Sequence, residues 1–426
     1  MTARLDRPNE PEDVLAHIPE GADVIVPLTL GEPIGLIDTL EAHAEELRGV
    51  RIHRMDPYLR RRYIDGEFPG KLEHVDYFLG AGSRQAFWDG HCDLVPNHFS
   101  EMPLLLRKST RCTIALAAAS PPDRHGYFSL GTNADYTAAF IGEIPFFLEV
   151  NAQMPRTFGH NQLHLSQIAG WTRVDRPLYE ATVPPPDDRD QRIADLIAER
   201  VPDGACLQIG IGRIPNALLT SLAGHRDLGL HTEALSDGVL DLMEAGALTG
   251  ARKLHERNKH VATFCIGTKR LYDWLDNNTS VALEPVDWVN DPRVVAKEPN
   301  FVSINATSEV DLMGQAASET IGGRYWSSSG GQADFARGAM YSVGGKAFLV
   351  LHSTTHDGAS RINLQLTPGS VVTTLKNTVD HIVTEYGVAE LRGRSLSQRA
   401  DALIRIAHPQ HRDRLTAEAR KFGFLR

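Results

Sequence analysis

The stretch that decides the fold is Leu228-Gly-Leu-His-Thr-Glu233-Ala-Leu-Ser-Asp-Gly238. A short apolar run leads into a polar turn, and a helical spacing through Leu240, Leu242 and Met243 follows. Glu233 therefore stands where a strand is expected to end, which is the usual place for chemistry in an open α/β sheet. We hypothesise that Glu233 is a carboxylate nucleophile.

A second stretch, about twenty residues upstream, repeats this plan of apolar strand, glycine turn and helix start. It reads Gln208-Ile-Gly210-Ile-Gly212-Arg-Ile-Pro215-Asn216. Pro215 occupies the place of the third glycine in a G-x-G-x-x-G fingerprint, which disfavours a dinucleotide site. A glycine turn alone is a weak signal, because any strand-to-helix turn can need glycine. We expect this one to turn backbone N–H groups toward Glu233.

The length and composition predict a multidomain globular protein. The chain has 426 residues, of which 42% are hydrophobic and 23% charged, and this suggests two or three domains. A formal net charge of −10 argues against nonspecific binding to nucleic acid. The four cysteines lie apart and are interpreted as free thiols in a reducing compartment. No signal-peptide core or membrane-length apolar run occurs, so we expect a cytoplasmic protein without a membrane segment.

The clearest domain boundary is the proline-rich segment Thr182-Val-Pro-Pro-Pro-Asp-Asp188, whose acids can cap a helix over 189–200. After it, strands are expected near 205–210, 227–232, 260–267, 301–306 and 346–353, and helices over 396–408 and 411–421. Strand–helix alternation in both halves predicts two open α/β domains with mostly parallel sheets. Their predicted ranges are 1–183 and 184–426. One large α/β domain is the alternative.

Six blocks of the sequence resemble the acetyl-CoA hydrolase/transferase family, the family I CoA-transferases that include 4-hydroxybutyrate CoA-transferase. They keep the family order and extend over about residues 20 to 420. The blocks are Ser120-Pro-Pro-Asp-Arg-His-Gly-Tyr-Phe-Ser-Leu-Gly131, Val150-Asn-Ala-Gln-Met-Pro-Arg156, Leu207-Gln-Ile-Gly-Ile-Gly-Arg-Ile-Pro-Asn-Ala217, His231-Thr-Glu-Ala-Leu-Ser-Asp-Gly238, Gly330-Gly-Gln-Ala-Asp-Phe-Ala-Arg-Gly338 and Val383-Thr-Glu-Tyr-Gly-Val-Ala389.

The resemblance implies two tandem α/β domains of the CoA-transferase type, with the active site in the cleft between them. It implies ping-pong transfer of CoA from a short acyl-CoA to a small carboxylic acid, through a glutamyl-CoA thioester at Glu233. The acids would be of the 4-hydroxybutyrate, butyrate, acetate, succinate or itaconate class. CoA and acyl-CoA are then substrates, and no permanently bound cofactor or metal is expected. A homodimer or higher homo-oligomer is implied by the resemblance alone.

The same resemblance suggests which residues bind CoA or stabilise an oxyanion. Asn305 could contact the pantetheine, although a turn asparagine satisfied by its neighbours is an alternative. A lysine after two glycines could approach the CoA phosphates, although a surface turn is nearly as plausible. The full predicted set is Gly210, Ile211, Gly212, Arg213, Ile214, Asn305, Gly330, Gly331, Gln332 and Lys346.

Several other polar residues have both a functional and a structural interpretation. His352 and His356 depart from the family pattern and could border the acyl pocket, or they could be packing variants. Two His pairs at i, i+4 (160/164 and 352/356) lack the glutamate of a HExxH site, so a metal is disfavoured. The run Arg60 to Arg62 could meet a second substrate carboxylate, although such a run is more often a solvated face. Glu385 is more plausibly a structural carboxylate than a partner of Glu233.

Two competing functions share the predicted site. An acyl-CoA hydrolase would use the same glutamate and let water resolve the intermediate, and access of water to a cleft cannot be read from a sequence. A non-catalytic CoA-ester sensor on the same fold is the second competitor, because fold alone does not decide function. No G-x-S-x-G elbow occurs, which disfavours a serine thioesterase.

Overall fold

The computed structural model describes residues 7–426, which form two compact units. Unit 1 runs to Ala181 and also holds Val261–Val289, and unit 2 holds Thr182–His260 and Asn290–Arg426. The sequence analysis assigned 261–289 to the C-terminal domain, and here the structure differs. Backbone hydrogen bonds explain the difference, since Cys265 N donates to Thr132 O (2.8 Å) and Leu283 N to Phe158 O (2.7 Å). Such long-range pairings carry no local sequence signal.

Unit 1 is built on a seven-stranded sheet in which every neighbouring pair of strands is parallel. The order is β4-β3-β2-β1-β5-β7-β9. Its interior strand β5 carries the sequence IALAAA and is buried at every residue, as expected for a parallel strand covered on both faces. The strands are β1 (Asp23–Ile25), β2 (Val50–Arg54), β3 (Leu72–Asp76), β4 (Asp93–Leu94), β5 (Ile114–Ala119), β7 (Phe146–Asn151) and β9 (Ile168–Val174).

Short helices and a small antiparallel strand pair complete unit 1. The helix Ile34–Ala42 is followed by a 3₁₀ turn at Ala44–Glu46. The sequence analysis did not anticipate α3, which begins with a proline in its first turn. The elements are α1 (Ile34–Ala42), α2 (Arg84–Trp88), α3 (Met102–Ser109), α7 (Lys269–Leu275), α8 (Val286–Val289), the strand pair β6 (Tyr127–Ser129) and β8 (Gln162–His164), and β14 (Phe264–Cys265) and β15 (Val281–Leu283). β13 (His260–Ala262) crosses the unit boundary.

Unit 2 repeats the plan with a six-stranded sheet in the order β11-β10-β16-β21-β23-β24. All neighbouring pairs are parallel except β23 and β24, which form an antiparallel hairpin at one edge. The predicted fold class, α/β with mostly parallel sheets, is therefore confirmed. The strands are β10 (Cys206–Ile209), β11 (Gly229–Leu230), β16 (Phe301–Ala306), β21 (Lys346–Val350), β23 (His381–Thr384) and β24 (Gly387–Glu390).

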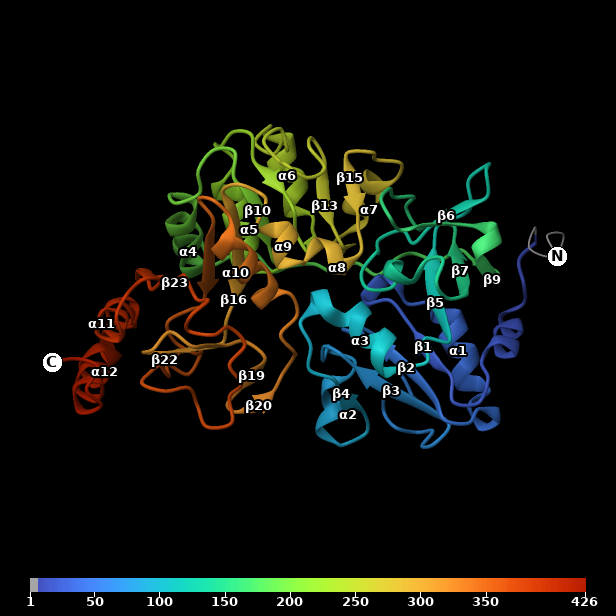
Figure 1. Cartoon of the computed structure of the whole chain (residues 1–426), viewed down its shortest axis with the longest axis horizontal. Coiled ribbons are helices and arrows are strands. Elements are labelled where there is room, and N and C mark those ends of the chain that lie inside the picture. Colours follow the sequence, from blue (N-terminus) through green and yellow to red (C-terminus); the bar gives the residue numbers. More distant parts are fainter. Residues whose placement is uncertain (1–6) are drawn as a thin grey trace. The chain divides into compact units, whose positions relative to one another are not determined.

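The helices of unit 2 follow the strands with short turns. Helix α4 begins at the predicted acidic cap, where the Asp187 carboxylate accepts from the backbone N–H of Arg189 and Asp190. Helix α11 packs against β24, and α12 packs against α11 near the C-terminus (Figure 1). The helices are α4 (Asp188–Ala198), α5 (Arg213–Ser221), α6 (Gly238–Glu244), α9 (Pro292–Val295), α10 (Gln332–Tyr341), α11 (Leu396–Ile406) and α12 (Pro409–Lys421).

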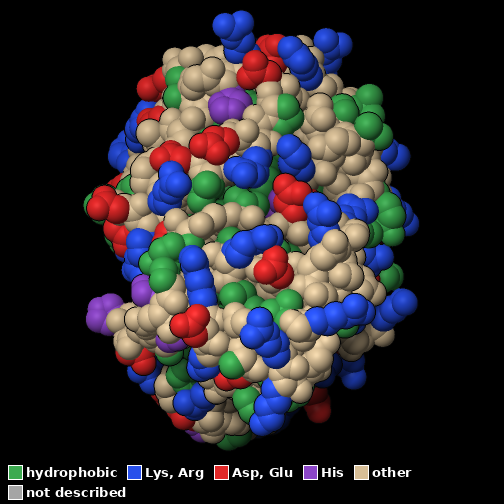
Figure 2. Space-filling model, turned by 90° about the vertical axis from the view of Figure 1, so that its left-hand side faces the viewer, with side chains coloured by type: hydrophobic (Ala, Val, Ile, Leu, Met, Phe, Trp, Pro, Cys, Tyr) green, Lys and Arg blue, Asp and Glu red, His purple; other side chains and the backbone are tan. Residues whose placement is uncertain are grey.

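Several very short strands lie outside the two main sheets. They are β12 (Ala234–Leu235), β17 (Glu309–Asp311), β18 (Ala316–Ala317), β19 (Thr320–Ile321), β20 (Arg324–Tyr325) and β22 (Ile362–Asn363). None of the helices in the described range 7–426 is long and apolar enough to cross a membrane. On the face drawn in Figure 2, cationic and anionic side chains are interspersed, as on an ordinary globular surface.

The parallel sheet of unit 2 brings the predicted site residues to one edge. The carboxyl ends of β11, β10 and β16 are neighbours, and they lead to Glu233, to the glycine turn at 210–212 and to Asn305. β11 has only two residues, fewer than the predicted strand over 227–232, because the chain leaves the ladder after Leu230. Glu233 thus lies in a turn just beyond an edge strand.

Candidate active site

The Glu233 carboxylate is half-buried and is held by an asparagine that the sequence analysis did not single out. Asn290 Nδ2 donates to Glu233 Oε2 at 2.7 Å. The Asn290 side chain is fully buried. In the sequence, Asn290 is marked only by the Asp291 that follows it and by the proline at which α9 begins. An Asn-Asp-Pro turn is common, so this pattern did not indicate a site residue. A buried amide that donates to a carboxylate fixes the orientation of that carboxylate.

Gly331 lies against the same pair of side chains. A Cβ atom built on Gly331 would collide with Glu233 Oε2 and with Asn290 Nδ2. Gly331 is also the N-cap of α10, so the positive end of a ten-residue helix lies beside an anionic carboxylate. Glycine at this position is therefore required by close approach rather than by an unusual backbone dihedral.

Thr232 ties the Glu233 turn to the end of β10. Its Oγ1 donates to Ile209 O (3.0 Å) and accepts from Ile209 N (3.3 Å), so one hydroxyl satisfies both backbone groups of Ile209. The glycine turn begins at the next residue. Gly212 has φ of 141°, a conformation that L-residues rarely adopt, and it is the N-cap of α5. The predicted proximity of the glycine turn and the Glu233 turn follows from this link.

Two predicted CoA-binding side chains are engaged within the protein. Asn305 and Gln208 exchange amide hydrogen bonds of 2.9 and 3.2 Å. Gln332 Nε2 donates to Ser318 Oγ (2.8 Å) and Thr374 Oγ1 (3.0 Å). The alternative of a turn asparagine satisfied by its neighbours fits Asn305, and the Gln332 amide nitrogen is likewise engaged within the protein.

Arg213 and His352 belong to one charged cluster at the start of α4. Arg213 Nε lies 2.8 Å from Asp190 Oδ2, and its Nη2 lies 3.0 Å from Asp187 Oδ2. His352 Nε2 lies 2.7 Å from Asp190 Oδ1. Asp187, Asp190 and His352 place three possible metal-ligand atoms within 4.8 Å of one another, but a guanidinium already pairs with both carboxylates. His352 thus contacts α4, while His356 is exposed.

Lys346 is not brought together with Glu233. It is the first residue of β21, at the amino edge of the sheet, whereas the Glu233 turn follows the carboxyl end of its strand. Its ammonium donates to Arg200 O at 2.7 Å. The Gly-Gly-Lys sequence therefore forms the turn that leads into β21, which agrees with the surface-turn alternative.

The remaining candidates have other partners. Glu385, after β23, accepts from Ser353 Oγ (2.7 Å) and Ser353 N (2.9 Å), which agrees with a structural carboxylate. In the arginine run each side chain pairs with an acid of unit 1, and Arg61 contacts the buried Glu32. In the pair 160/164, His160 contacts Glu284 and His164 contacts Ser166, so these two rings turn to different partners.

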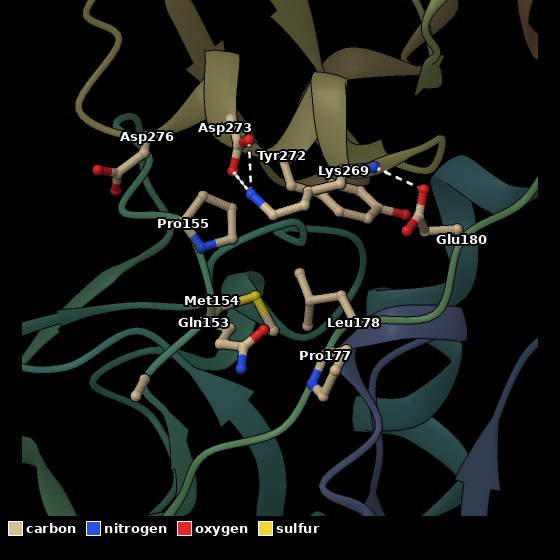
Figure 3. Close-up of a pocket in the computed structure, with 11 residues that line it drawn as sticks. Gln153, Met154, Pro155, Pro177, Leu178, Glu180, Lys269, Tyr272, Asp273 and Asp276 are labelled. Carbon is tan, nitrogen blue, oxygen red and sulfur yellow. Dashed lines mark hydrogen bonds and ion pairs between the residues drawn. The ribbon is translucent and has the colours of Figure 1, made fainter.

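Unit 1 holds a separate pocket of about 490 Å³ (Figure 3). Met154, Pro155 and Leu178 give it an apolar lining, and Lys269 enters from α7. The Lys269 ammonium lies 2.6 Å from the Asp273 carboxylate, and the backbone N–H of Lys269 donates to the Glu180 carboxylate at 2.9 Å. No predicted site residue lines this pocket.

The local chemistry around Glu233 suits nucleophilic catalysis by a carboxylate. One carboxylate oxygen is fixed by a buried amide, and a helix N-terminus and a glycine turn lie close by. These groups favour an ionised side chain and can stabilise negative charge that develops on a bound carbonyl.

Known protein families and individual proteins match this chain in sequence. The family model described as the acetyl-CoA hydrolase/transferase N-terminal domain matches residues 7–176, and the C-terminal domain model of the same family matches residues 267–419. A succinyl-CoA:cyclohexane-1-carboxylate CoA transferase from Geobacter metallireducens is 43% identical, covering 97% of this chain and 95% of that protein. A 4-hydroxybutyrate coenzyme A transferase from Clostridium kluyveri is 40% identical, covering 96% of each.

Solved structures agree with the sequence matches. The crystal structure of RipA from Yersinia pestis superposes with a TM-score of 0.92 at 33% identity, covering 99% of this chain and 98% of that one. Acetyl-CoA hydrolases are more distant relatives; the Yarrowia lipolytica enzyme is 31% identical over 54% of this chain and 43% of its own length.

Proposed function

The chain belongs to the acetyl-CoA hydrolase/transferase family, and on that premise we propose that Glu233 is the nucleophile through which it transfers CoA from an acyl-CoA to a carboxylate. Transfer, rather than hydrolysis, is the activity named in the relatives that match over nearly the whole chain. Their names make succinyl-CoA and 4-hydroxybutyrate the first donor and acceptor to test.

The proposed reaction is a sequence of acyl substitutions at carbonyl carbons. The Glu233 carboxylate attacks the thioester carbonyl, the C–S bond breaks, and a mixed anhydride and CoA thiolate form. The thiolate then attacks the glutamyl carbonyl, which gives a glutamyl-CoA thioester and releases the donor acid as its carboxylate. The acceptor carboxylate repeats these steps in reverse, so that a new acyl-CoA leaves and Glu233 is regenerated. Charge is balanced throughout without a metal or redox partner.

The local contacts assign a role to each neighbour of Glu233. Asn290 holds one carboxylate oxygen, which orients the other for attack and lowers the entropic cost of reaction. Each tetrahedral intermediate carries an oxyanion, and the turns at 210–212 and 330–331 are the proposed sources of N–H donors. Arg213 shapes the first turn through its ion pairs with Asp187 and Asp190. Binding of the CoA tail far from the carbonyl can hold the thioester against Glu233.

The observation that carries the proposal is the close approach of Gly331 to the Asn290–Glu233 pair. A carboxylate that served only as a helix cap or surface charge would need neither a fully buried amide donor nor a glycine cleared of any side chain. Here two separate elements, the turn before α9 and the start of α10, converge on one carboxylate oxygen.

The test is steady-state exchange between succinyl-CoA and a panel of short carboxylic acids. The proposal expects parallel lines in double-reciprocal plots and loss of turnover, on the order of 10⁴-fold, in Glu233→Ala and Glu233→Asp with CoA binding retained. Glu199→Gln, at an exposed glutamate of unit 2, is the matched control. Near-wild-type rates in either Glu233 variant would contradict the mechanism. Release of CoA that does not depend on the acceptor acid would indicate a hydrolase.

We also propose that the enzyme works in the cytoplasm as a homodimer or higher homo-oligomer. The cytoplasmic assignment is supported by four cysteines that are all free thiols, as expected in a reducing compartment. The oligomer follows from the family resemblance. Sedimentation of the purified chain at micromolar concentration tests it, and a monomer would contradict it.

A further inference from the structure

Lys253 is a buried lysine whose ammonium binds the backbone beneath the Glu233 turn. Only 4% of the residue is exposed. Its Nζ donates to Leu230 O and to Lys259 O, both at 2.8 Å. Leu230 is the last residue of β11, so this hydrogen bond is made at the point where the chain leaves the sheet toward Glu233.

The charge on Lys253 is costly to keep in this position. Among residues 7–426, no carboxylate oxygen lies within 4.0 Å of its ammonium, and burial lowers the pKa of Lys253 below its usual value. A buried cation without an ion pair is destabilising unless its hydrogen bonds compensate. An apolar side chain of the same length would fill the space at lower cost, which suggests that the two carbonyl contacts serve a purpose.

The facing strand is adapted to the lysine stem. A Cβ atom on Gly229, in β11, would lie 2.5 Å from Lys253 Cγ. Glycine is therefore needed for the stem to cross the strand and reach Leu230 O. Gly229 has no positive φ, so close approach is the reason for glycine here.

β11 needs such support because it is short and lies at the edge of the sheet. It has two residues and pairs with one main-sheet neighbour, β10. Beyond it, the Glu233 turn is linked back to β10 through His231 N, which donates to Leu207 O at 2.9 Å, and through Thr232. Lys253 adds a hydrogen bond to Leu230 O, in the same peptide unit as His231 N, at the start of this turn.

We propose that Lys253 is a positioning residue that fixes the end of β11 and thereby holds Glu233 in its attacking position; this inference rests on the proposed function of Glu233. Lys253 does not touch the substrate in this account. Loss of its ammonium should therefore slow formation of the glutamyl-CoA thioester while leaving CoA binding in place.

The first experiment compares Lys253→Met with wild type in single-turnover formation of the CoA adduct and in steady state. We expect kcat and the rate of adduct formation to fall at least about tenfold, with KM for the acyl-CoA changed less than about threefold. Lys253→Arg keeps the stem and the donors and should recover most of the rate. Lys421→Met, at an exposed lysine at the end of α12, is the matched control and should leave both constants unchanged.

A second experiment uses the Gly229 contact and does not depend on one variant folding. Gly229→Ala should displace the lysine stem and lower kcat at least about tenfold on its own. In a Lys253→Ala background, which removes the clashing Cγ, the same glycine change should cost less than about threefold. Equal losses in both backgrounds would overturn the inference.

Failure of the proposed function and failure of the Lys253 proposal would give different results. If wild type forms no adduct on Glu233, the proposed function itself is wrong. If wild type forms the adduct and Lys253→Met forms it at the wild-type rate, only the role of Lys253 is wrong. A variant whose KM rises while kcat is unchanged would also contradict positioning, because it would place Lys253 in substrate binding.

Discussion

The two units share one architecture but use the carboxyl edges of their sheets differently. In unit 1 the charged residues that follow the strands close on one another: Glu32 lies 2.7 Å from Arg54 and 2.6 Å from Arg61, and all three side chains are buried. In unit 2 the corresponding edge presents Glu233, half-buried, with an amide and a helix N-terminus around it. A parallel α/β sheet can thus place charge at its carboxyl edge either for stability or for chemistry.

The difference lies in how each carboxylate is satisfied. Glu32 is held by two guanidinium groups, and these lower its pKa against the opposing effect of burial. Two cations around one buried acid neutralise the charge of that acid and fix its position, so it cannot easily attack a substrate. Glu233 accepts a hydrogen bond from the uncharged Asn290 amide, which orients the carboxylate for the proposed attack on a substrate.

The largest effect expected from breaking this contrast is on stability. Glu32→Gln removes the acid between Arg54 and Arg61 and leaves the buried Arg54 guanidinium without a counter-charge, while Arg61 keeps its ion pair with Asp38. We expect a loss of about 3–5 kcal/mol in the free energy of unfolding, measured by urea denaturation. Glu233→Gln should change that free energy by less than about 1 kcal/mol. Equal losses in the two variants would mean that Glu233 is also a structural carboxylate.

The stability of the protein should fall in acid, because unit 2 buries a histidine that the fold keeps neutral. Burial lowers the pKa of His260 to about 4, whereas the unfolded chain binds that proton near 6.5. As pH falls from about 6.5 to 4 the unfolded state takes up the proton first, so stability falls. His260→Gln should reduce this loss by up to about 3 kcal/mol at pH 4. An unchanged acid limb of the stability curve would show that His260 titrates normally.

A smaller effect is expected on the rate when the orienting amide is removed. Asn290→Ala leaves the Glu233 carboxylate in place but without its buried donor. We expect kcat to fall about 10- to 100-fold, measured with succinyl-CoA and a short acid. Asn305→Ala removes an amide that is paired with Gln208 and is the control, with a smaller loss. A larger loss of kcat in Asn305→Ala would indicate that Asn305, near the end of β16, orients Glu233 in place of Asn290.

The smallest effect is expected at the surface of unit 1. Arg60 is mostly exposed and pairs with Asp65, and surface pairs of this kind contribute little to stability. Arg60→Ala should leave the midpoint of urea denaturation and the KM for dicarboxylic acids unchanged. A specific rise in KM for succinate would restore the idea that the arginine run meets a second substrate carboxylate.

The sequence predicted the repeated strand–helix plan because buried parallel strands such as Ile114–Ala119 are unbroken apolar runs. It also brought Glu233 and the glycine turn to one edge, since parallel strands share a direction. Asn290 escaped notice because its contact with Glu233 is made 57 residues along the chain and leaves no periodic signal. Lys346 was interpreted from its glycines, although its place at the start of a strand points to the opposite edge.

The most direct test of the central claim is the intact-protein mass after mixing with acyl-CoA donors and no acceptor acid. The account predicts a covalent CoA adduct that maps to Glu233 by peptide analysis and disappears when a short carboxylic acid is added. An adduct on another residue, or turnover with no covalent adduct in rapidly quenched samples, would contradict it.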